Sequence, residues 1–145
     1  DSGLIASGTG ASNSHGIYDF TGKIGFLSSS SGDNSVYLSI ATTGATNVGL
    51  SFDAMTIRNP YDGTTNTNVQ GLVLQYRVGT VATDAFTALS YSMSEYQNNT
   101  NAQTTGTTGQ NIKVSLNATL PASCNNQSVV QIRWNAYLSF SEYCR

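Results

Sequence analysis

The amino-acid sequence predicts an all-β fold, an antiparallel β-sandwich of the jelly-roll or Ig-like kind. Apolar and polar residues alternate in several short runs along the 145-residue chain, which is the period of half-buried strands. Stretches rich in Gly, Ser, Thr and Asn separate these runs, as turns do between antiparallel strands. No segment keeps a helical period, so a layer of helices is not expected.

The first half of the chain contains four expected strands. Short apolar runs at 17–20 and 24–27 predict the first two. The turn-rich stretches "SSSSGDNS" and "ATTGATN" precede the next two. Their alternation sets one apolar face against one polar face in each strand: Val36, Leu38 and Ile40 against Tyr37 and Ser39, and Val48, Leu50 and Phe52 against Gly49, Ser51 and Asp53.

The second half contains the remaining expected strands. One runs from 72 to 78, a short apolar piece covers 86–91, and another runs from 112 to 116. The last alternates Val130, Ile132, Trp134 and Ala136 with Gln131, Arg133 and Asn135. We therefore expect Trp134 to point into the core rather than to a ligand.

Residues 1–145 are expected to form a single β-sandwich domain, since this length suits one core. Residues 1–15 predict an irregular head, in which Leu4 and Ile5 would be able to dock on a sheet edge. Residues 97–110 consist almost entirely of Asn, Gln, Thr and Gly and predict a long polar loop. The alternative for this loop is a binding segment carried on a rigid scaffold.

The composition favours a secreted or cell-surface location. Only 10% of the residues are charged, against roughly 25% in an average globular chain. Ser, Thr and Asn supply most of the polar residues instead, and a polar surface with little charge is typical of exported proteins. The net charge of −2 gives no reason to expect nucleic-acid binding. No apolar run reaches the roughly 20 residues that span a bilayer, so membrane insertion is not expected.

Two cysteines, Cys124 and Cys144, flank the strand that contains Trp134. An even count in an export-like chain favours a disulfide between them. The alternative is a pair of buried free thiols. A metal site on these cysteines is disfavoured, because His15 is the only other soft ligand and no CxxC spacing occurs.

The sequence offers little for catalysis, and we expect a protein that is not an enzyme, with no catalytic residue. The single histidine, His15, has no GxSxG motif to accompany it. The eight carboxylates are spread singly, whereas a glycosidase needs two that converge. Most of them stand in turns, where Asp stabilises the bend.

Calcium is the one cofactor that the loops would suit; otherwise none is expected. Asp33 in "SGDNS" and Asp62 in "NPYDGTTNTN" place carboxylate, amide and carbonyl oxygens in loops, and Asp53 would be a further ligand from its strand. The EF-hand spacing is missing, and turn chemistry accounts for the same residues.

Candidate ligand-binding residues are taken from the loops and strand ends. Tyr61 and Asp62 stand in a turn, and Tyr96 and Asn99 stand where the polar loop begins. Flat tyrosine rings beside amide and carboxylate groups suit a glycan or a protein surface as ligand.

The run "GIYDFTGKIGFLSSSSGDNSVYLSIATTGATNVGLSFDAMTIRN" resembles the β-sandwich domains of large secreted Bacteroidota surface proteins. The strand "LVLQYRVG" and the triplet Ile132-Arg133-Trp134 resemble two later strands of that family. The similarity covers roughly residues 16–137. It implies an exported chain in which such domains stand beside lamin-tail, nuclease, adhesin-like and sorting domains.

The chain departs from these relatives at its end. In them the strand like Ile132-Arg133-Trp134 is followed by a final strand with an acidic pair, whereas this chain has "SFSEYCR". The resemblance thus implies a sandwich that lacks its final strand. A fragment cleaved after Arg145, a neighbouring subunit, or the chain's own segment around Leu4 and Ile5 would then fill the open edge.

The function expected from the sequence is a non-enzymatic secreted module for cell-surface attachment or extracellular assembly. One alternative is a carbohydrate-binding module of a polysaccharide-degrading enzyme. Another is a filament or pilus-like subunit that a strand from a neighbouring chain completes.

Overall fold

The computed structural model of the chain describes residues 5–6, 16–19, 23–27, 33–55, 69–91, 96–98 and 114–139. In these residues nearly all regular structure is β-strand, and the one helical segment is a 3-10 turn, η1 (Ala122–Cys124). None of the described residues form a helix that is long and apolar enough to cross a membrane. The prediction of an all-β, mainly antiparallel fold is confirmed. The sandwich arrangement, with its choice between jelly-roll and Ig-like topology, stays a prediction.

The strands follow the alternating runs of the sequence. In chain order they are β1 (Ile5–Ala6), β2 (Gly16–Asp19), β3 (Ile24–Leu27), β4 (Asn34–Ile40), β5 (Gly49–Ala54), β6 (Val69–Val78), β7 (Thr87–Ala88), β8 (Tyr96–Asn98), β9 (Val114–Thr119) and β10 (Val130–Ser139). Strand β8 contains Gln97 and Asn98, so the expected loop 97–110 is wrong at its first two residues. Within the expected head 1–15, Ile5–Ala6 forms β1. The other residues of both segments lie outside the described part.

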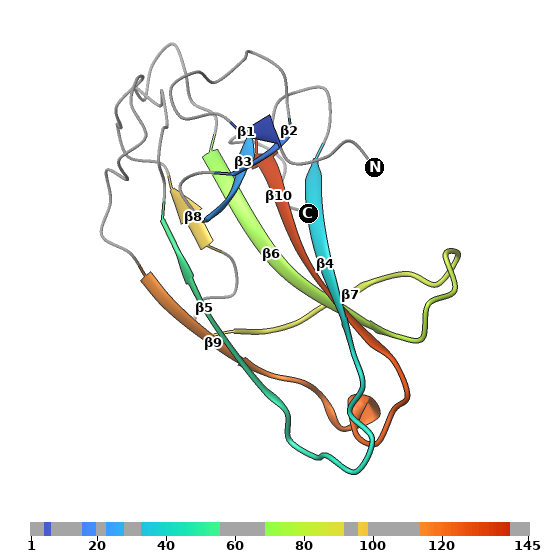
Figure 1. Ribbon diagram of the computed structural model, residues 1–145. Helices are drawn as coiled ribbons and strands as arrows, with labels where there is room; N and C mark the ends of the chain where they lie inside the picture. The colour runs from blue at the N-terminus through green and yellow to red at the C-terminus, as the bar shows by residue number, and fades with distance from the viewer. Residues whose placement is uncertain are drawn as a thin grey trace.

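The largest sheet has the strand order β4-β10-β6-β7, and β8 also pairs with β6. Every pair in it is antiparallel. Strand β10 lies at its centre, where Val130 stands opposite Ile40 of β4 on one side and Val78 of β6 on the other. Figure 1 shows β4, β10 and β6 side by side as long, twisted strands. Strand β10 has partners on both sides, and within the described residues the edges of this sheet lie at β4 and at β7 and β8.

Two smaller sheets accompany it. Strands β5 and β9 form an antiparallel pair, and Tyr91 adds an isolated bridge to Ala118 of β9. Strands β1, β2 and β3 form a three-stranded sheet, in which β1 pairs with β2 in parallel. In Figure 1 the β5–β9 pair lies to the lower left of the large sheet, and β1, β2 and β3 lie near the upper ends of β6 and β10.

The core lies between the large sheet and the β5–β9 pair. Phe52 of β5 meets Trp134 of β10 edge to face, with ring centroids 5.9 Å apart, and Tyr91 stands 5.8 Å from the same Phe52 ring. Trp134 is therefore directed inward, as predicted. Each fully buried Leu, Ile or Val stabilises the fold by about 1.5–3 kcal/mol. The buried residues of this core are Leu74, Leu89, Tyr91, Leu116, Ala118, Leu120, Cys124, Val130 and Ile132.

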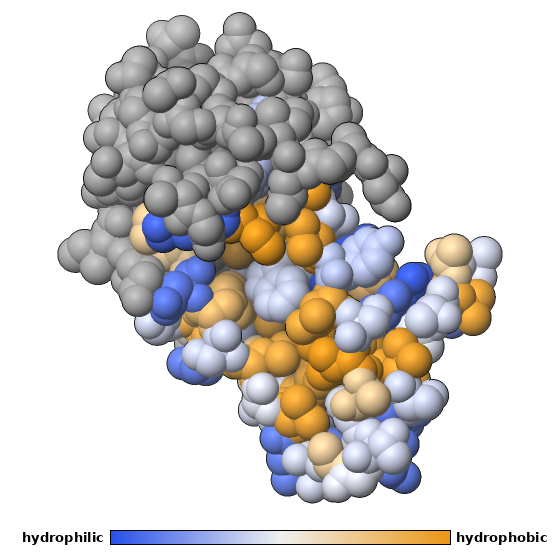
Figure 2. Space-filling view, in the orientation of Figure 1, coloured by the Kyte–Doolittle hydropathy of each residue, from blue (hydrophilic) through white to orange (hydrophobic). Residues whose placement is uncertain are grey.

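The inner face of β4 is only partly covered. Leu38 stands opposite Ile132 of β10, which is fully buried, yet Leu38 is 49% exposed. Of the β4 side chains, Ile40 packs against the core. Figure 2 shows apolar surface gathered in the middle of this view, around β4. Among the described residues β4 forms its ladder with β10 alone, so its second edge carries no strand there.

Hydrogen bonds join two loops at the end of the molecule where β4 leads to β5. Thr42 is 2% exposed; its Oγ1 donates to the carbonyl oxygen of Cys124 and accepts from the backbone N–H of Gln127 at 3.0 Å. The amide oxygens of Asn125 and Asn126 accept two further backbone N–H groups from the facing loop. Buried polar groups need such partners, and this network fixes the loops to each other.

Cys124 is a buried free thiol, so the predicted disulfide with Cys144 is wrong. Cys144 itself lies outside the described residues. The physical reason is the length of β10. The strand begins at Val130, which belongs to the same buried cluster as Cys124, and runs about 30 Å to Ser139. The five residues from there to Cys144 span at most about 18 Å, too little to return along the strand.

Candidate functional site

The outer face of the largest sheet carries a cluster of polar and aromatic side chains. Alternate residues of β4, β6 and β10 project onto this face, opposite the core. The pairing register sets them in two neighbouring rows across the three strands, and Phe86, just before β7, lies against both rows. We name this set the outer-face cluster: Tyr37, Arg133 and Gln75 in one row, Ser39, Gln131 and Arg77 in the next, and Phe86.

Hydrogen bonds tie each arginine to a glutamine of the neighbouring strand. Nε of Arg133 donates to Oε1 of Gln75 at 2.8 Å, and Nη2 of the same arginine donates to the same oxygen. Nε of Arg77 donates to Oε1 of Gln131 at 2.7 Å. Nε2 of Gln131 donates in turn to Oγ of Ser39 at 3.1 Å. Because these hydrogen bonds already order both guanidinium groups, less side-chain entropy would be lost if a ligand bound to them.

The loop between β6 and β7 turns back over the sheet and brings Phe86 to the arginines. Nη1 of Arg77 donates to the carbonyl oxygens of Val81 and Asp84, at 2.7 and 2.9 Å, and these bonds hold the loop down. The ζ carbons of Arg77 and Arg133 lie 4.5 and 4.0 Å from the centroid of the Phe86 ring. Both cations therefore make cation–π contacts with one ring.

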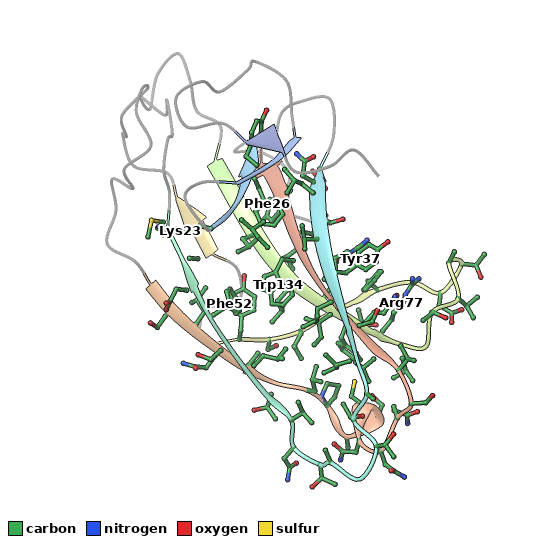
Figure 3. The ribbon with its side chains drawn as sticks, viewed as in Figure 1. Lys23, Phe26, Tyr37, Phe52, Arg77 and Trp134 are labelled. Atoms are coloured by element: carbon green, nitrogen blue, oxygen red, sulfur yellow. The ribbon has the colours of Figure 1, made fainter. Side chains whose placement is uncertain are left out.

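Tyr37 gives the cluster an accessible aromatic surface. It is 58% exposed, and its ring centroid lies 6.4 Å from that of Phe86, with the two planes at 42°. Gln131, by contrast, is 6% exposed and supports the cluster from below. Figure 3 shows Tyr37 and Arg77 on the opposite side of the sheet from Trp134, which lies toward the core.

The two arginines make the cluster positive. The pKa of Arg133 is lowered from its ordinary value by burial and then by the charge of Arg77, while Asp33 acts in the opposite direction. An arginine remains protonated under such influences. Within the described residues both guanidinium groups bond to neutral amide and carbonyl oxygens and form no ion pair. The cluster is thus a local positive site in a chain of net charge −2.

The chemistry of the cluster suits binding. It contains a flat exposed ring, two guanidinium planes and two amides, which contact ring faces and donate or accept hydrogen bonds. It contains no carboxylate, imidazole or thiol that would act as a general base. The cluster therefore offers groups that are able to contact the ring faces and polar atoms of a ligand.

The ligand-binding residues predicted from the sequence are not members of the outer-face cluster. Tyr61, Asp62 and Asn99 lie outside the described residues. Tyr96 begins β8, and its backbone stands opposite Leu72 of β6, at the far edge of the large sheet from Tyr37. Their role in binding stays a prediction.

The predicted calcium ligands have separate surroundings. Oδ1 of Asp53 accepts from Oγ of Ser115 at 2.7 Å, across the β5–β9 pair. Oδ2 of Asp33 lies 3.4 Å from Nδ2 of Asn135, across the ladder of the large sheet. Asp62 lies outside the described residues. In the described part of the chain, no three His, Cys, Asp or Glu residues are grouped as a metal site.

Sequence reasoning missed the outer-face cluster, although part of its signal was present. The alternation that turns Trp134 inward turns Gln131 and Arg133 outward, and Gln75 and Arg77 likewise oppose the apolar residues of their strand. The strand order and register that make them neighbours come only from long-range pairing.

Comparisons with protein-family models, with curated proteins and with solved structures found nothing that matches this chain. The similarity to Bacteroidota surface domains therefore stays a prediction from short motifs.

Proposed function

We propose that this protein is a non-enzymatic binding module, secreted or held at a cell surface, that acts in attachment or extracellular assembly. Its ligand lies on the outer face of the large sheet. The observation that carries the proposal is the outer-face cluster, in which Phe86 and two glutamines hold Arg77 and Arg133 in fixed positions beside exposed Tyr37. An arginine that only faces solvent does not require a fixed position. In a binding site, fixed arginines reduce the conformational entropy lost on binding.

A carbohydrate is the ligand class that fits best. Sugars present both apolar ring faces and hydroxyl groups, and the cluster offers an aromatic ring to the first and amide and guanidinium groups to the second. The face is also formed by a sheet, which suits an extended chain that contacts several strands in succession. This role agrees equally with an adhesive module and with a module that directs a polysaccharide-degrading enzyme to its substrate.

A glycan-binding screen with purified protein tests the proposal, followed by titration calorimetry with the glycans that bind. Tyr37→Ala removes the exposed ring and is expected to weaken binding by about tenfold, the loss of a stacking contact. Ser51→Ala is the matched control, because Ser51 is exposed on β5 of the other layer, and it should bind like the wild type. If Tyr37→Ala bound every such glycan as tightly as the wild type, the binding site would not lie on this face.

A second candidate function rests on β4. Its ladder partner in the described residues is β10 alone, and Leu38 on its inner face is 49% exposed. An extended strand from a neighbouring chain would pair with the second edge of β4, which carries no strand among the described residues, and would cover Leu38, as in filament subunits completed by strand addition. Sedimentation across a range of protein concentrations tests this candidate: self-association that Leu38→Lys abolishes supports it, and a monomer at every concentration rules it out.

A further inference from the structure

We infer that the ligand of the outer-face cluster carries carboxylate groups, and we identify it as a polysaccharide that contains uronic acid. The inference rests on the proposed function and adds the chemical class of the ligand. It is drawn from three features: arginine N–H groups that have no acceptor among the described residues, positive charge that no ion pair neutralises among those residues, and a low number of cations in the whole sequence.

The arginines retain N–H groups for a ligand. Arg77 uses Nε toward Gln131 and Nη1 toward the loop carbonyl oxygens. Arg133 uses Nε and Nη2 toward Gln75. Within the described residues Nη2 of Arg77 and Nη1 of Arg133 have no acceptor. A guanidinium group donates strongly to a carboxylate, which is planar and accepts two parallel hydrogen bonds.

The two positive charges lie close together and repel each other. Both ζ carbons are within 4.5 Å of one ring centroid, and the charge of Arg77 lowers the pKa of Arg133. Asp33 offsets part of this charge, but it forms no ion pair with either arginine among the described residues. An anionic ligand would relieve the repulsion. Phe86 also excludes water from one side of the guanidinium groups, so an ion pair here is worth more than one between fully solvated groups.

The number of cations favours a uronate over a densely sulfated chain. The whole sequence has six Lys and Arg residues and a net charge of −2, and only two of those cations belong to the cluster. A heavily sulfated polymer would meet net repulsion from the rest of the protein. Spaced carboxylates on otherwise neutral sugars match two arginines, and Tyr37, Gln75 and Ser39 remain for the ring faces and hydroxyl groups.

The experiment compares three ligands with the wild-type protein by titration calorimetry. Oligogalacturonate carries the carboxylates, its methyl ester has the same sugars without the charge, and heparin supplies sulfate at high density. The acid is expected to bind about tenfold more tightly than the ester, the difference that charge-assisted hydrogen bonds make, and to weaken as salt is raised. Heparin is expected to bind more weakly than the acid.

Charge variants then assign the effect to this face. Arg77→Gln and Arg133→Gln should each weaken binding of the acid by about tenfold. Each should weaken binding of the ester less, because the ester loses a hydrogen bond there and no ion pair. Asp33→Asn should strengthen binding of the acid by about twofold, because it removes a nearby negative charge. Lys23→Gln is the matched control: it removes one positive charge from the other side of the molecule in Figure 3 and should change neither affinity.

The outcomes separate this inference from the proposed function. If the ester binds as tightly as the acid, the uronate inference is overturned and the binding module stands. If heparin binds and the acid does not, the carboxylate assignment is overturned in favour of sulfate. If no glycan of any charge binds, both proposals fail. The comparison of acid with ester uses wild-type protein, so it decides the matter even if an arginine variant does not fold.

Discussion

Replacement of Thr42 by valine should destabilise the fold strongly, although the two side chains have nearly the same shape. Thr42 is 2% exposed, and its hydroxyl both donates to the carbonyl oxygen of Cys124 and accepts from the N–H of Gln127. The variant loses both bonds and leaves two polar groups buried without these partners. Each lost bond costs about 1 kcal/mol, and each buried unsatisfied group adds to this, so the free energy of unfolding should fall by roughly 2–4 kcal/mol.

Equilibrium unfolding in urea measures this loss. Trp134 is the only tryptophan and packs against Phe52 in the core, so its fluorescence reports on the contact between the two layers. With a slope of about 2 kcal/mol per molar urea, the midpoint of Thr42→Val should fall by about 1–2 M.

The neighbouring Thr43 provides the control. It is exposed, and its hydroxyl makes one long contact, 3.4 Å to the carbonyl oxygen of Gln127. Thr43→Val should therefore change the free energy of unfolding by no more than about 0.5 kcal/mol. Two results would contradict this prediction: both variants losing the same free energy of unfolding, or Thr42→Val unfolding at the wild-type midpoint. In either case the buried hydrogen bonds of the Thr42 hydroxyl would not be what stabilises these loops.

Three further predictions concern the core and the sheet. Gly71→Ala should cost about 1–3 kcal/mol, because the added methyl would lie 2.2 Å from the Tyr137 ring, and Tyr137→Ala in the same chain should recover most of that loss in a double-mutant cycle of urea midpoints. Burial raises the pKa of the Cys124 thiol above its unfolded value, and a hydrogen bond with Ser123 opposes this shift. The protonated thiol therefore contributes its full stabilisation below about pH 8.5, and this contribution is lost as the pH rises further. Cys124→Ala should remove that alkaline loss. The Cys124 thiol should react with a thiol reagent only after unfolding, and rapid modification of Cys124 in the native protein, located by peptide mapping, would contradict its burial. Trp134→Ala should lower the free energy of unfolding by about 3 kcal/mol through lost packing, measured by circular dichroism, and a wild-type midpoint would place this ring outside the core.

Local pattern was enough to predict the elements of the fold. The inward direction of Trp134 and the faces of β4, β5 and β6 follow from a period of two residues, which any extended segment imposes on its own side chains. The same pattern did not predict strands that are short or polar. Strand β8 has the composition of a loop and exists because β6 offers it a pairing edge.

The disulfide could not be judged from spacing alone. The positions of Cys124 and Cys144 on either side of a strand suggested a bridge. Because β10 extends to Ser139, the thiol of Cys124 lies at the other end of that strand from the residues that lead to Cys144. A strand's true length is decided by the ladders on both of its sides, which the spacing of cysteines does not encode.

By itself, the sequence determined the β class, the inward and outward faces of the longer alternating strands, and a weakly charged chain with few cations. Only the tertiary structure decided that β10 is the central strand and that Arg77, Phe86 and Arg133 meet on its outer face. Alternation acts between adjacent residues, and the sequence shows it directly. Strand order and register depend on hydrogen bonds and packing between segments more than fifty residues apart, as for Arg77 and Gln131, and on their collective free energy.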